Sequence, residues 1–242
     1  IRNSKGTKPP YTMKNSSSSR RVFLGRAALA SGILAFPSFL RAADPAEAAR
    51  ARVDAALPDR APASPRKPRR LLIFELNVNY GGHASIPTAS LAFTQMGRKT
   101  GAFEAVVSRD PQAFRPENLA TFDAVFFNNN VGNLFEDVAL RQSLVDFVYG
   151  GGGLMGVHGT TVAFTKWPGA VEDFPEFGLM IGARGANHRI NTERVVVKLD
   201  DPGHPINAAF GGKSFEYRDE FFRPQAPYSR RRLRVLLSFD TE

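Results

Sequence analysis

The stretch GGGGLMGVHG at residues 150–159 places a short apolar strand between a run of four glycines and a histidine. Glycines of this kind end a preceding helix, because glycine readily takes the left-handed backbone conformation found after helix C-termini. Residues 154–157 predict a strand, and the glycines on either side of His158 leave room for a sharp turn from strand to helix. Such a turn lifts one side chain above the sheet, beside free backbone N–H groups. We therefore expect the functional centre of the chain at His158.

Strand-like and helix-like segments alternate around this turn. Short apolar runs predict strands at 71–76, 104–108, 122–127 and 154–157, and apolar residues at helical spacing predict helices at 87–99 and 136–149, with a short helical turn at 115–119. Alternation with short connections predicts parallel βαβ units, in which helices cover both faces of the sheet. The predicted fold class is α/β, with a doubly wound, mostly parallel sheet.

The last third of the chain is less regular. Residues 194–199 and 233–239 are strand-like, and a polar and aromatic stretch at 215–223 separates them. The last of these strands runs almost to Glu242, so that nothing follows to cover it. We expect the domain to be truncated at its C-terminus.

Basic residues are concentrated in the first part of the chain. The net charge is +9, but residues 1–70 carry 15 Lys and Arg against 4 Asp and Glu, which leaves 17 against 19 in residues 71–242. A near-neutral domain gives little support to a nucleic-acid partner, although Arg230, Arg231 and Arg232 form a local basic triple. The chain has no cysteine, which excludes disulfides, thiolate nucleophiles and iron–sulfur ligation. Any metal would need His, carboxylate or carbonyl ligands.

Residues 13–48 have the order of an export signal. Residues 1–12 precede the first methionine, and we interpret them as a leader foreign to the native protein. The pair Arg20-Arg21 stands before Val-Phe-Leu and an apolar stretch at 27–40, a pattern that resembles the twin-arginine signal. A run of about 14 apolar residues is short for a membrane span, which needs roughly 20, and residues 46–48 offer a small-x-small cleavage pattern. We favour cleaved export to a bacterial periplasm over a membrane anchor, so that the chain meets the membrane only through this signal.

Residues 49–70 are rich in proline and arginine. Prolines remove backbone donors and favour extended conformations, and the segment has little apolar surface that could offset the cost of ordering. It therefore predicts a flexible linker, after which the α/β domain occupies residues 71–242.

All four histidines, His83, His158, His188 and His204, stand in polar, loop-like contexts. In doubly wound sheets, ligands bind outside the carboxyl ends of the strands, and His83 and His158 follow the first and the fourth predicted strands. A single histidine is more often a surface or capping residue, and His204, flanked by glycine and proline, is equally well explained as a turn residue. The joint placement of His83 and His158 favours a functional site.

Five short motifs occur in order: GGHASIP (81–87), FDAVFFNNNVGN (122–133), GGGGLMGVHGTT (150–161), DPGHPI (201–206) and RDEFF (218–222). Together they resemble the trehalose-utilisation, or ThuA-like, family over nearly all of residues 71–242. The resemblance implies a class I glutamine amidotransferase-like, flavodoxin-like fold. Amidotransferases of this fold carry a Gly-x-Cys-x-Gly turn, whereas this chain has His158 there and no cysteine. Glutaminase chemistry is therefore excluded.

The resemblance also implies a role in carbohydrate metabolism, on trehalose or a related disaccharide or keto-sugar. By position, the four histidines match the family's histidines, and Asp219 and Glu220 match its Asp-Glu pair. On this basis we assign catalytic roles to His158, His83 and Glu220. We assign substrate-binding roles to Asn128, Asn129, His188, His204 and Asp219.

Two classes of function stay open. In the first, the protein is an exported sugar-active enzyme in which His158 and His83 act as acid and base and Glu220 assists. A variant of this hypothesis has two or three of His83, His158 and His188 hold a divalent metal with Glu220 or Asp219. In the second class, the chain is a non-catalytic carbohydrate-binding or scaffolding module of a larger protein, whose sugar site would be lined by Asn128, Asn129, Trp167 and Tyr217. The first class requires the histidines to converge within about 12 Å of one another.

Overall fold

The computed structural model describes residues 45–185 and 187–239. The predicted leader at 1–12 and the export signal up to residue 44 lie outside these residues. Within the described part of the chain, no helix is both long enough and apolar enough to cross a membrane.

The segment that we predicted to be a flexible linker begins with a helix. Helix α1 (Pro45–Ala56) is rich in alanine and arginine, which are among the strongest helix formers, and the prolines that suggested an extended chain come only after it. The cleavage-like residues 46–48 fall in its first turn. Lys99 binds the carbonyl oxygens of Asp54 and Leu57 at 2.9 and 3.2 Å and thereby ties the end of α1 to the neighbouring helix α2 (Ile86–Thr100). The prediction of an extended linker is thus wrong for the part up to Ala56.

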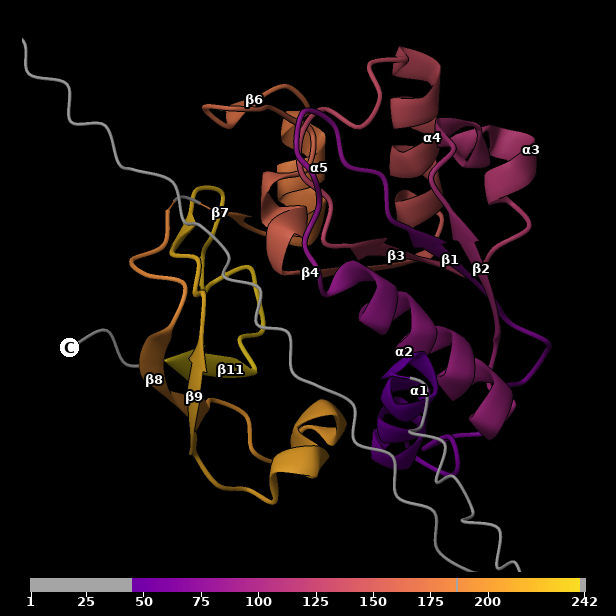
Figure 1. Ribbon diagram of the computed structural model, residues 1–242. Coiled ribbons are helices and arrows are strands. Elements are labelled where there is room, and N and C mark those ends of the chain that lie inside the picture. Colours follow the sequence, from indigo (N-terminus) through magenta and orange to yellow (C-terminus); the bar gives the residue numbers. More distant parts are fainter. Residues whose placement is uncertain (1–44, 186, 240–242) are drawn as a thin grey trace, which may run out of the picture. The chain divides into compact units, whose positions relative to one another are not determined.

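A four-stranded parallel sheet forms the centre of the domain (Figure 1). Its strands are β1 (Arg70–Phe74), β2 (Glu104–Ser108), β3 (Ala124–Asn128) and β4 (Gly153–Val157), in the order β2-β1-β3-β4. Leu72 of β1 is paired with Val106 on one side and with Val125 on the other. The connections are α2, the short helices η1 (Pro111–Phe114) and α3 (Pro116–Leu119), and α4 (Val138–Tyr149).

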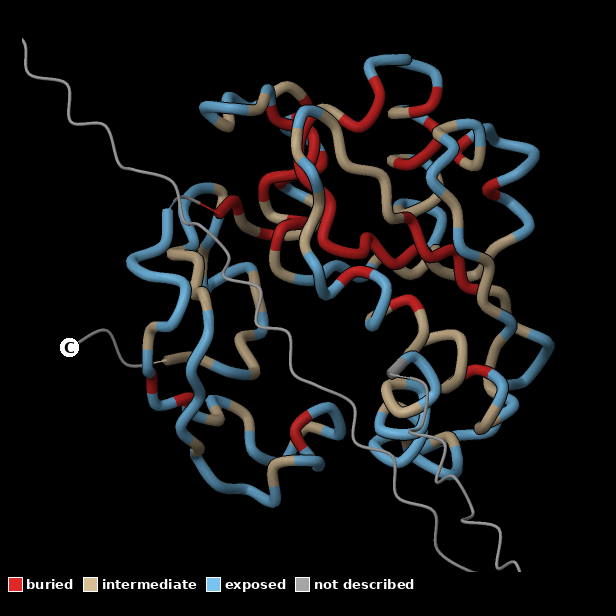
Figure 2. Tube along the Cα trace, in the orientation of Figure 1, coloured by how far each residue is buried: buried red, intermediate tan, exposed pale blue. Residues whose placement is uncertain are grey.

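Alternate residues of β1 pack against helices on opposite faces of this sheet. Leu71 and Ile73 belong to a cluster with Phe93 of α2, whereas Leu72 and Phe74 belong to the larger core, which includes Leu140 and Leu144 of α4. Figure 2 shows the buried positions running along the central strands. The sheet is therefore doubly wound, as the sequence predicted.

The chain after β4 is built from short elements. They are η2 (His158–Val162), β5 (Thr165–Lys166), β6 (Val171–Glu172), α5 (Pro175–Ile181), β7 (Arg184–Gly185), β8 (Glu193–Leu199), η3 (Pro205–Phe210), β9 (Phe215–Asp219), β10 (Pro224–Gln225) and β11 (Leu237–Phe239). Strands β11, β8 and β9 form a second, antiparallel sheet. The predicted strand at 233–239 is shorter than expected, and β9 replaces a stretch that we had assigned no strand.

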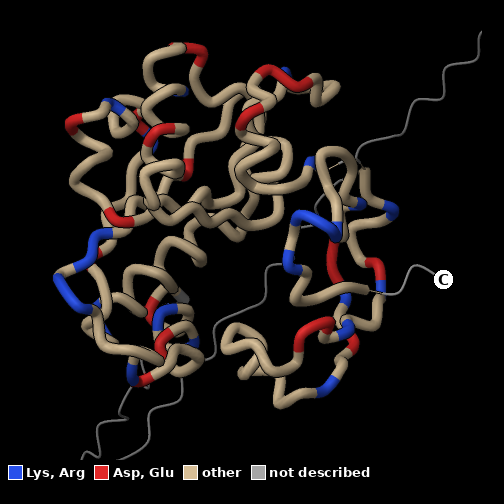
Figure 3. The backbone as a smooth tube through the Cα atoms, turned by 180° about the vertical axis from the view of Figure 1, so that it is seen from behind, with Lys and Arg blue, Asp and Glu red and all other residues tan. Residues whose placement is uncertain are grey.

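Lys and Arg residues are frequent along the segment before β1 and around α1 and the end of α2 (Figure 3). Two of them, Lys67 and Arg69, bind Asp123 at 2.9 and 2.7 Å, and these contacts hold the pKa of its carboxyl well below the usual range. This cluster lies at the amino ends of the strands. The predicted functional loops follow the carboxyl ends, so the two regions occupy opposite edges of the sheet.

Candidate functional site

The loops that follow β1, β3 and β4 lie at one edge of the sheet because the strands are parallel. From β1 the chain crosses to β2 on one side and then to β3 on the other, so the strand order reverses between β1 and β3. Ligands bind at such reversal points in doubly wound sheets. The order of the strands alone therefore marks this edge for a site.

The turn predicted at His158 is present, and its backbone is unusual. His158 has a φ of 44°, in a region that residues other than glycine rarely adopt, and it begins η2. The N–H of the next residue, Gly159, donates to Oδ1 of Asn129 at 2.8 Å. A β-carbon at Gly159 would lie only 2.8 Å from that same oxygen, so glycine is required there. The turn is fixed by its neighbours, which makes the position of the His158 side chain well defined.

His83, His158 and Glu220 converge at this turn. The two imidazole rings meet edge to face with 4.9 Å between centroids, and Nε2 of His158 lies 3.4 Å from Oε2 of Glu220. Glu220 comes from the segment directly after β9, which brings the second sheet into the site. Phe222 packs against the His158 ring at 4.7 Å.

His188 fixes the carboxylate of Glu220 from the other side. Its Nε2 lies 2.7 Å from Oε1 of Glu220, while Oε2 faces His158. Each carboxylate oxygen therefore has its own imidazole partner. The side chain of Glu220 is only 18% exposed, so this bond forms in a partly desolvated setting.

One ligand atom from each of His83, His158 and Glu220 lies within 4.8 Å of the other two. Ligands at about 2.1 Å from a zinc ion are roughly 3.4 Å apart, so small side-chain rotations would bring these three atoms around a cation. We had predicted that two or three of His83, His158 and His188 hold the metal with Glu220 or Asp219. The described structure brings His83, His158 and Glu220 together, whereas His188 contacts the other oxygen of the Glu220 carboxylate.

Burial lowers the pKa of His83, and the nearby imidazole of His158 lowers it further, whereas Glu220 and the backbone of Asn129 oppose the shift. The Nδ1 atom of His83 is buried, and in the described structure it makes no hydrogen bond that satisfies the usual distance and angle criteria. Its Nε2 lies 3.3 Å from the hydroxyl oxygen of Tyr80. A neutral imidazole is the form that binds a metal or accepts a proton. His83 is therefore suited to either task.

Three residues to which we assigned substrate binding make structural contacts. Asn128 is fully buried and donates to the Ile86 carbonyl and to Ser90 of α2, so it ties the sheet to a helix. Asn129 supports the His158 turn by accepting a hydrogen bond from the N–H of Gly159. His204 caps η3 by accepting the N–H of Ile206 at 3.2 Å, and no contact in the described structure joins it to the other histidines.

Asp219 remains at the site but acts through the backbone. Its Oδ1 accepts the N–H of Glu220 at 2.8 Å, which orients the Glu220 segment. It also lines a pocket of about 330 Å³ together with His158, Thr161 and Glu220.

A second pocket, of about 390 Å³, adds Tyr80, which the sequence analysis missed, and Trp167, which it named only for the non-catalytic alternative. Tyr80 and Trp167 line it with His83, His188 and Glu220. Tyr80 stands three residues before His83 in the same loop, which was its only signal in the sequence. Glu220 and Phe222 line both pockets, so the cluster lies where they adjoin.

The sequence profile of the ThuA family, described as trehalose utilisation, matches residues 70–242. The chain belongs to the ThuA family. A search of curated proteins gives no match. The matched residues contain the whole of the ThuA site described above, from His83 to Phe222.

Two solved ThuA-like structures share the fold. One, from Bacteroides uniformis, is 21% identical, with a TM-score of 0.58, and the match covers 74% of this chain and 72% of that one. The other, from Parabacteroides merdae, is 16% identical with a TM-score of 0.52, over 72% and 68% of the two chains. At these identities the likeness establishes the architecture. Membership of the ThuA family suggests a role in carbohydrate metabolism.

Proposed function

We propose that this protein is a sugar-processing enzyme in which His83, His158 and Glu220 hold a divalent cation that polarises a hydroxyl or carbonyl group of the sugar. The observation that carries the proposal is the convergence of the three ligand atoms within 4.8 Å, on a carboxylate that His188 already orients. The family's link to trehalose utilisation supports the choice of a sugar, such as a disaccharide or its keto derivative.

The donor set suits this role. Two neutral imidazoles and one carboxylate form a ligand set used by catalytic zinc, which keeps a further position open for water or substrate. The hydrogen bond from His188 to the outer oxygen of Glu220 would hold this carboxylate in the orientation that a bound metal needs. A bound cation would supply a Lewis acid, which withdraws electron density from a coordinated sugar oxygen.

A second candidate mechanism uses the same residues without a metal. The lowered pKa of His83 leaves its ring neutral near pH 7, so that it can accept a proton from a sugar hydroxyl or from a carbon beside a carbonyl. Glu220, oriented by His188, would then hold His158 in place as the acid that gives a proton back to a sugar oxygen. The two mechanisms differ in whether turnover requires a cation.

The test is titration of the full chain, stripped of metal by a chelator, with Zn²⁺ or Mn²⁺ in a calorimeter. We expect one ion per chain, and at least tenfold weaker binding in His158→Gln and in Glu220→Gln. His204→Asn is the matched control, because asparagine also caps helices and His204 lies outside the cluster. Absence of saturable binding, or an equal loss in the control, would contradict the metal site. Turnover of disaccharides and keto-disaccharides with and without the ion then separates the two mechanisms.

The proposed enzyme is exported, and the twin-arginine pattern at residues 20–21 supports this location. Replacement of both arginines by lysine should leave the protein in the bacterial cytoplasm, whereas an unchanged periplasmic yield would refute the route. A non-catalytic carbohydrate-binding or scaffolding module is the alternative that the same site allows. It would bind sugar in the His158→Gln variant as tightly as in the wild type.

A further inference from the structure

The pocket of about 390 Å³ joins an aromatic surface to the histidine cluster. Tyr80 and Trp167 both line it, and their rings meet edge to face with 5.7 Å between centroids. The Tyr80 hydroxyl reaches Nε2 of His83 at 3.3 Å, which connects the aromatic pair to the proposed metal ligands. Trp167 is the only tryptophan of the chain.

Trp167 is carried by a hairpin that is too small to be stable alone. It directly follows β5, whose two residues pair with the two residues of β6. Isolated two-stranded hairpins are at best marginally stable in water. The residues after Trp167, Pro168 and Gly169, are exposed. The position of the tryptophan therefore depends on what holds the base of the hairpin.

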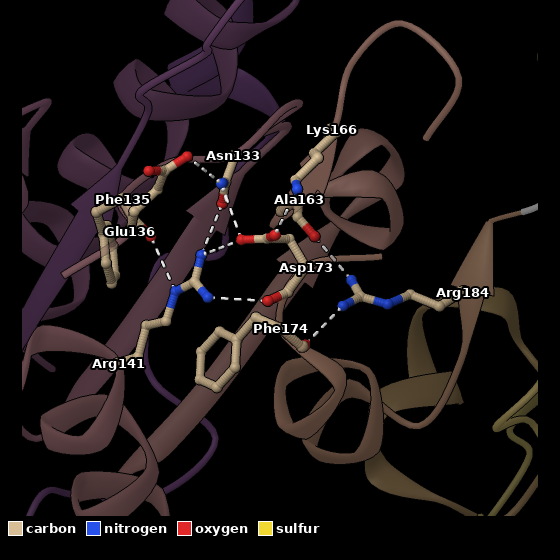
Figure 4. Close-up of polar contacts among 9 residues, drawn as sticks. All are labelled: Asn133, Phe135, Glu136, Arg141, Ala163, Lys166, Asp173, Phe174 and Arg184. Carbon is tan, nitrogen blue, oxygen red and sulfur yellow. Dashed lines mark hydrogen bonds and ion pairs between the residues drawn. The ribbon is translucent and has the colours of Figure 1, made fainter. Parts of the chain in front are cut away.

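Arg141 of α4 holds the end of the hairpin that leaves β6 (Figure 4). It donates to the side chain of Asp173 at 2.7 Å and to the Asp173 carbonyl at 2.8 Å, and Asp173 is the residue directly after β6. The same guanidinium donates to the carbonyl of Phe135 and to the side chain of Asn133. Its side chain is only 14% exposed.

Arg184 of β7 binds the chain at both ends of the β5–β6 hairpin. It donates to the Ala163 carbonyl at 2.7 Å, two residues before β5, and to the Phe174 carbonyl at 3.0 Å, two residues after β6 (Figure 4). Its Nε binds the carboxylate of Glu172, within β6, at 2.6 Å. The side chain is 5% exposed, and this burial lowers the pKa of the guanidinium.

Burying a guanidinium carries a large desolvation cost, which is recovered only when its donors find partners. The hydrogen bonds of Arg184 all go to the two ends of the hairpin, and those of Arg141 go to one of these ends and to the loop before α4. The buried Arg184 and the half-buried Arg141 thus anchor the base of a hairpin whose tip is exposed. An anchored base of this kind would hold the Trp167 side chain in place before any ligand arrives.

We propose that Trp167 and Tyr80 form a preorganised platform that binds the apolar C–H face of a pyranose ring, and that Arg141 and Arg184 are positioning residues for it. The inference rests on the proposed sugar chemistry of the cluster. A pyranose has an apolar face and a rim of hydroxyls, and the pocket offers both counterparts. Aromatic rings line it, and so do the polar side chains of Asn187 and Asn191. Its volume lies in the range of small-ligand sites.

Because Trp167 is the only indole, its fluorescence reports directly on the platform. We would titrate the full chain with trehalose, methyl β-glucoside and methyl α-glucoside, and with sorbitol, an open-chain polyol that has hydroxyls but no ring face. At least one pyranoside should change the Trp167 emission in a saturable way, and sorbitol should not. No saturable change with any of the three pyranosides, or an equal change with sorbitol, overturns the proposal.

Two sets of variants test the roles by calorimetry. Trp167→Leu should weaken pyranoside binding about tenfold, while Trp167→Phe retains part of the affinity. Glu172→Gln removes the negative charge that faces Arg184, at a carboxylate that is 38% exposed, so the fold should survive. We expect it to weaken pyranoside binding several-fold and to make the Trp167 emission more accessible to iodide quenching. Unchanged affinity in Trp167→Leu would overturn the platform, and unchanged quenching and affinity in Glu172→Gln would overturn the positioning role.

The cation titration keeps the two proposals apart. None of these variants changes a proposed ligand, so Zn²⁺ affinity should stay that of the wild type. A protein that binds Zn²⁺ at the cluster but no pyranoside at Trp167 refutes the platform alone. A protein in which a pyranoside perturbs Trp167 but no cation binds refutes the metal site alone.

Discussion

His188 lies outside the proposed ligand set, yet its removal should weaken cation binding. Its Nε2 donates to Oε1 of Glu220 at 2.7 Å and leaves Oε2 facing His158 and the proposed cation. A hydrogen bond to a charged group is worth about 1.5–3 kcal/mol when buried. Because the His188 side chain is 34% exposed, we take the lower end of that range, about 1.5–2 kcal/mol. His188→Ala should then reduce the affinity for Zn²⁺ roughly 10- to 30-fold, within the span known for residues that hydrogen-bond to metal ligands.

The assay is competition of the stripped protein with a fluorescent zinc chelator at pH 7.5. His188→Gln is the informative companion, because its amide nitrogen can replace Nε2 as donor and should recover part of the loss. His204→Asn should bind like the wild type, since His204 caps η3 away from the cluster. If His188→Ala binds Zn²⁺ as tightly as the wild type, the assignment of His188 as the support of Glu220 is wrong. If His188→Gln loses as much as His188→Ala, the hydrogen bond is not the cause.

Three further predictions concern acid and stability. Folding lowers the pKa of His83, so this imidazole binds a proton less readily in the folded protein than in the unfolded chain. The free energy of unfolding of the metal-free protein should therefore fall as the pH drops below about 6.5. In urea titrations at several pH values, His83→Gln should remove the part of this pH dependence that His83 causes. The pKa of Asp173 is lowered mainly by its hydrogen bond from Arg141, so this carboxylate stabilises the fold above about pH 4 and loses the effect as the pH falls further. Asp173→Asn should make the free energy of unfolding depend less on pH in that acid range. An unchanged pH dependence would count against the contact. Phe164 is fully buried against Phe135, Phe174 and other rings, so Phe164→Ala should cost about 3–5 kcal/mol and lower the melting temperature by roughly 6–20 °C in calorimetry, and a shift under 3 °C would contradict the packing.

The central sheet was predictable because its signals are local. Strand β2 has the predicted bounds, and the other three strands differ by one or two residues at their ends. The convergence of His83 and His158 followed from parallel topology, since the carboxyl ends of parallel strands meet at one edge. The placement of Glu220 could not follow from such rules, because it depends on how the second sheet packs beside the first. Only the resemblance to the ThuA family pointed to it.

Several side chains make contacts that the sequence analysis did not predict, and the causes are physical. Asn128 was assigned to the site because it ends a strand. Side chains alternate between the two faces of a strand, so Asn128 lies on the same face as Phe126, which is the face covered by α2. His204 was assigned to substrate binding because it matches a histidine of the family. It caps the short helix η3, which the sequence did not reveal because this stretch has no periodic pattern of apolar residues. The role of Arg184 was invisible in the sequence, because its partners Ala163 and Phe174 are bound through backbone carbonyls.

The most direct test of the account is anomalous scattering from crystals of the full chain grown with Zn²⁺ or Mn²⁺. We predict one strong peak bonded to His83, His158 and Glu220 at about 2.0–2.2 Å, with His188 still on the outer oxygen of the Glu220 carboxylate. A peak at His204 or at surface carboxylates, with the three predicted ligands unbound in the same crystal, would contradict the claim that this cluster is the metal site.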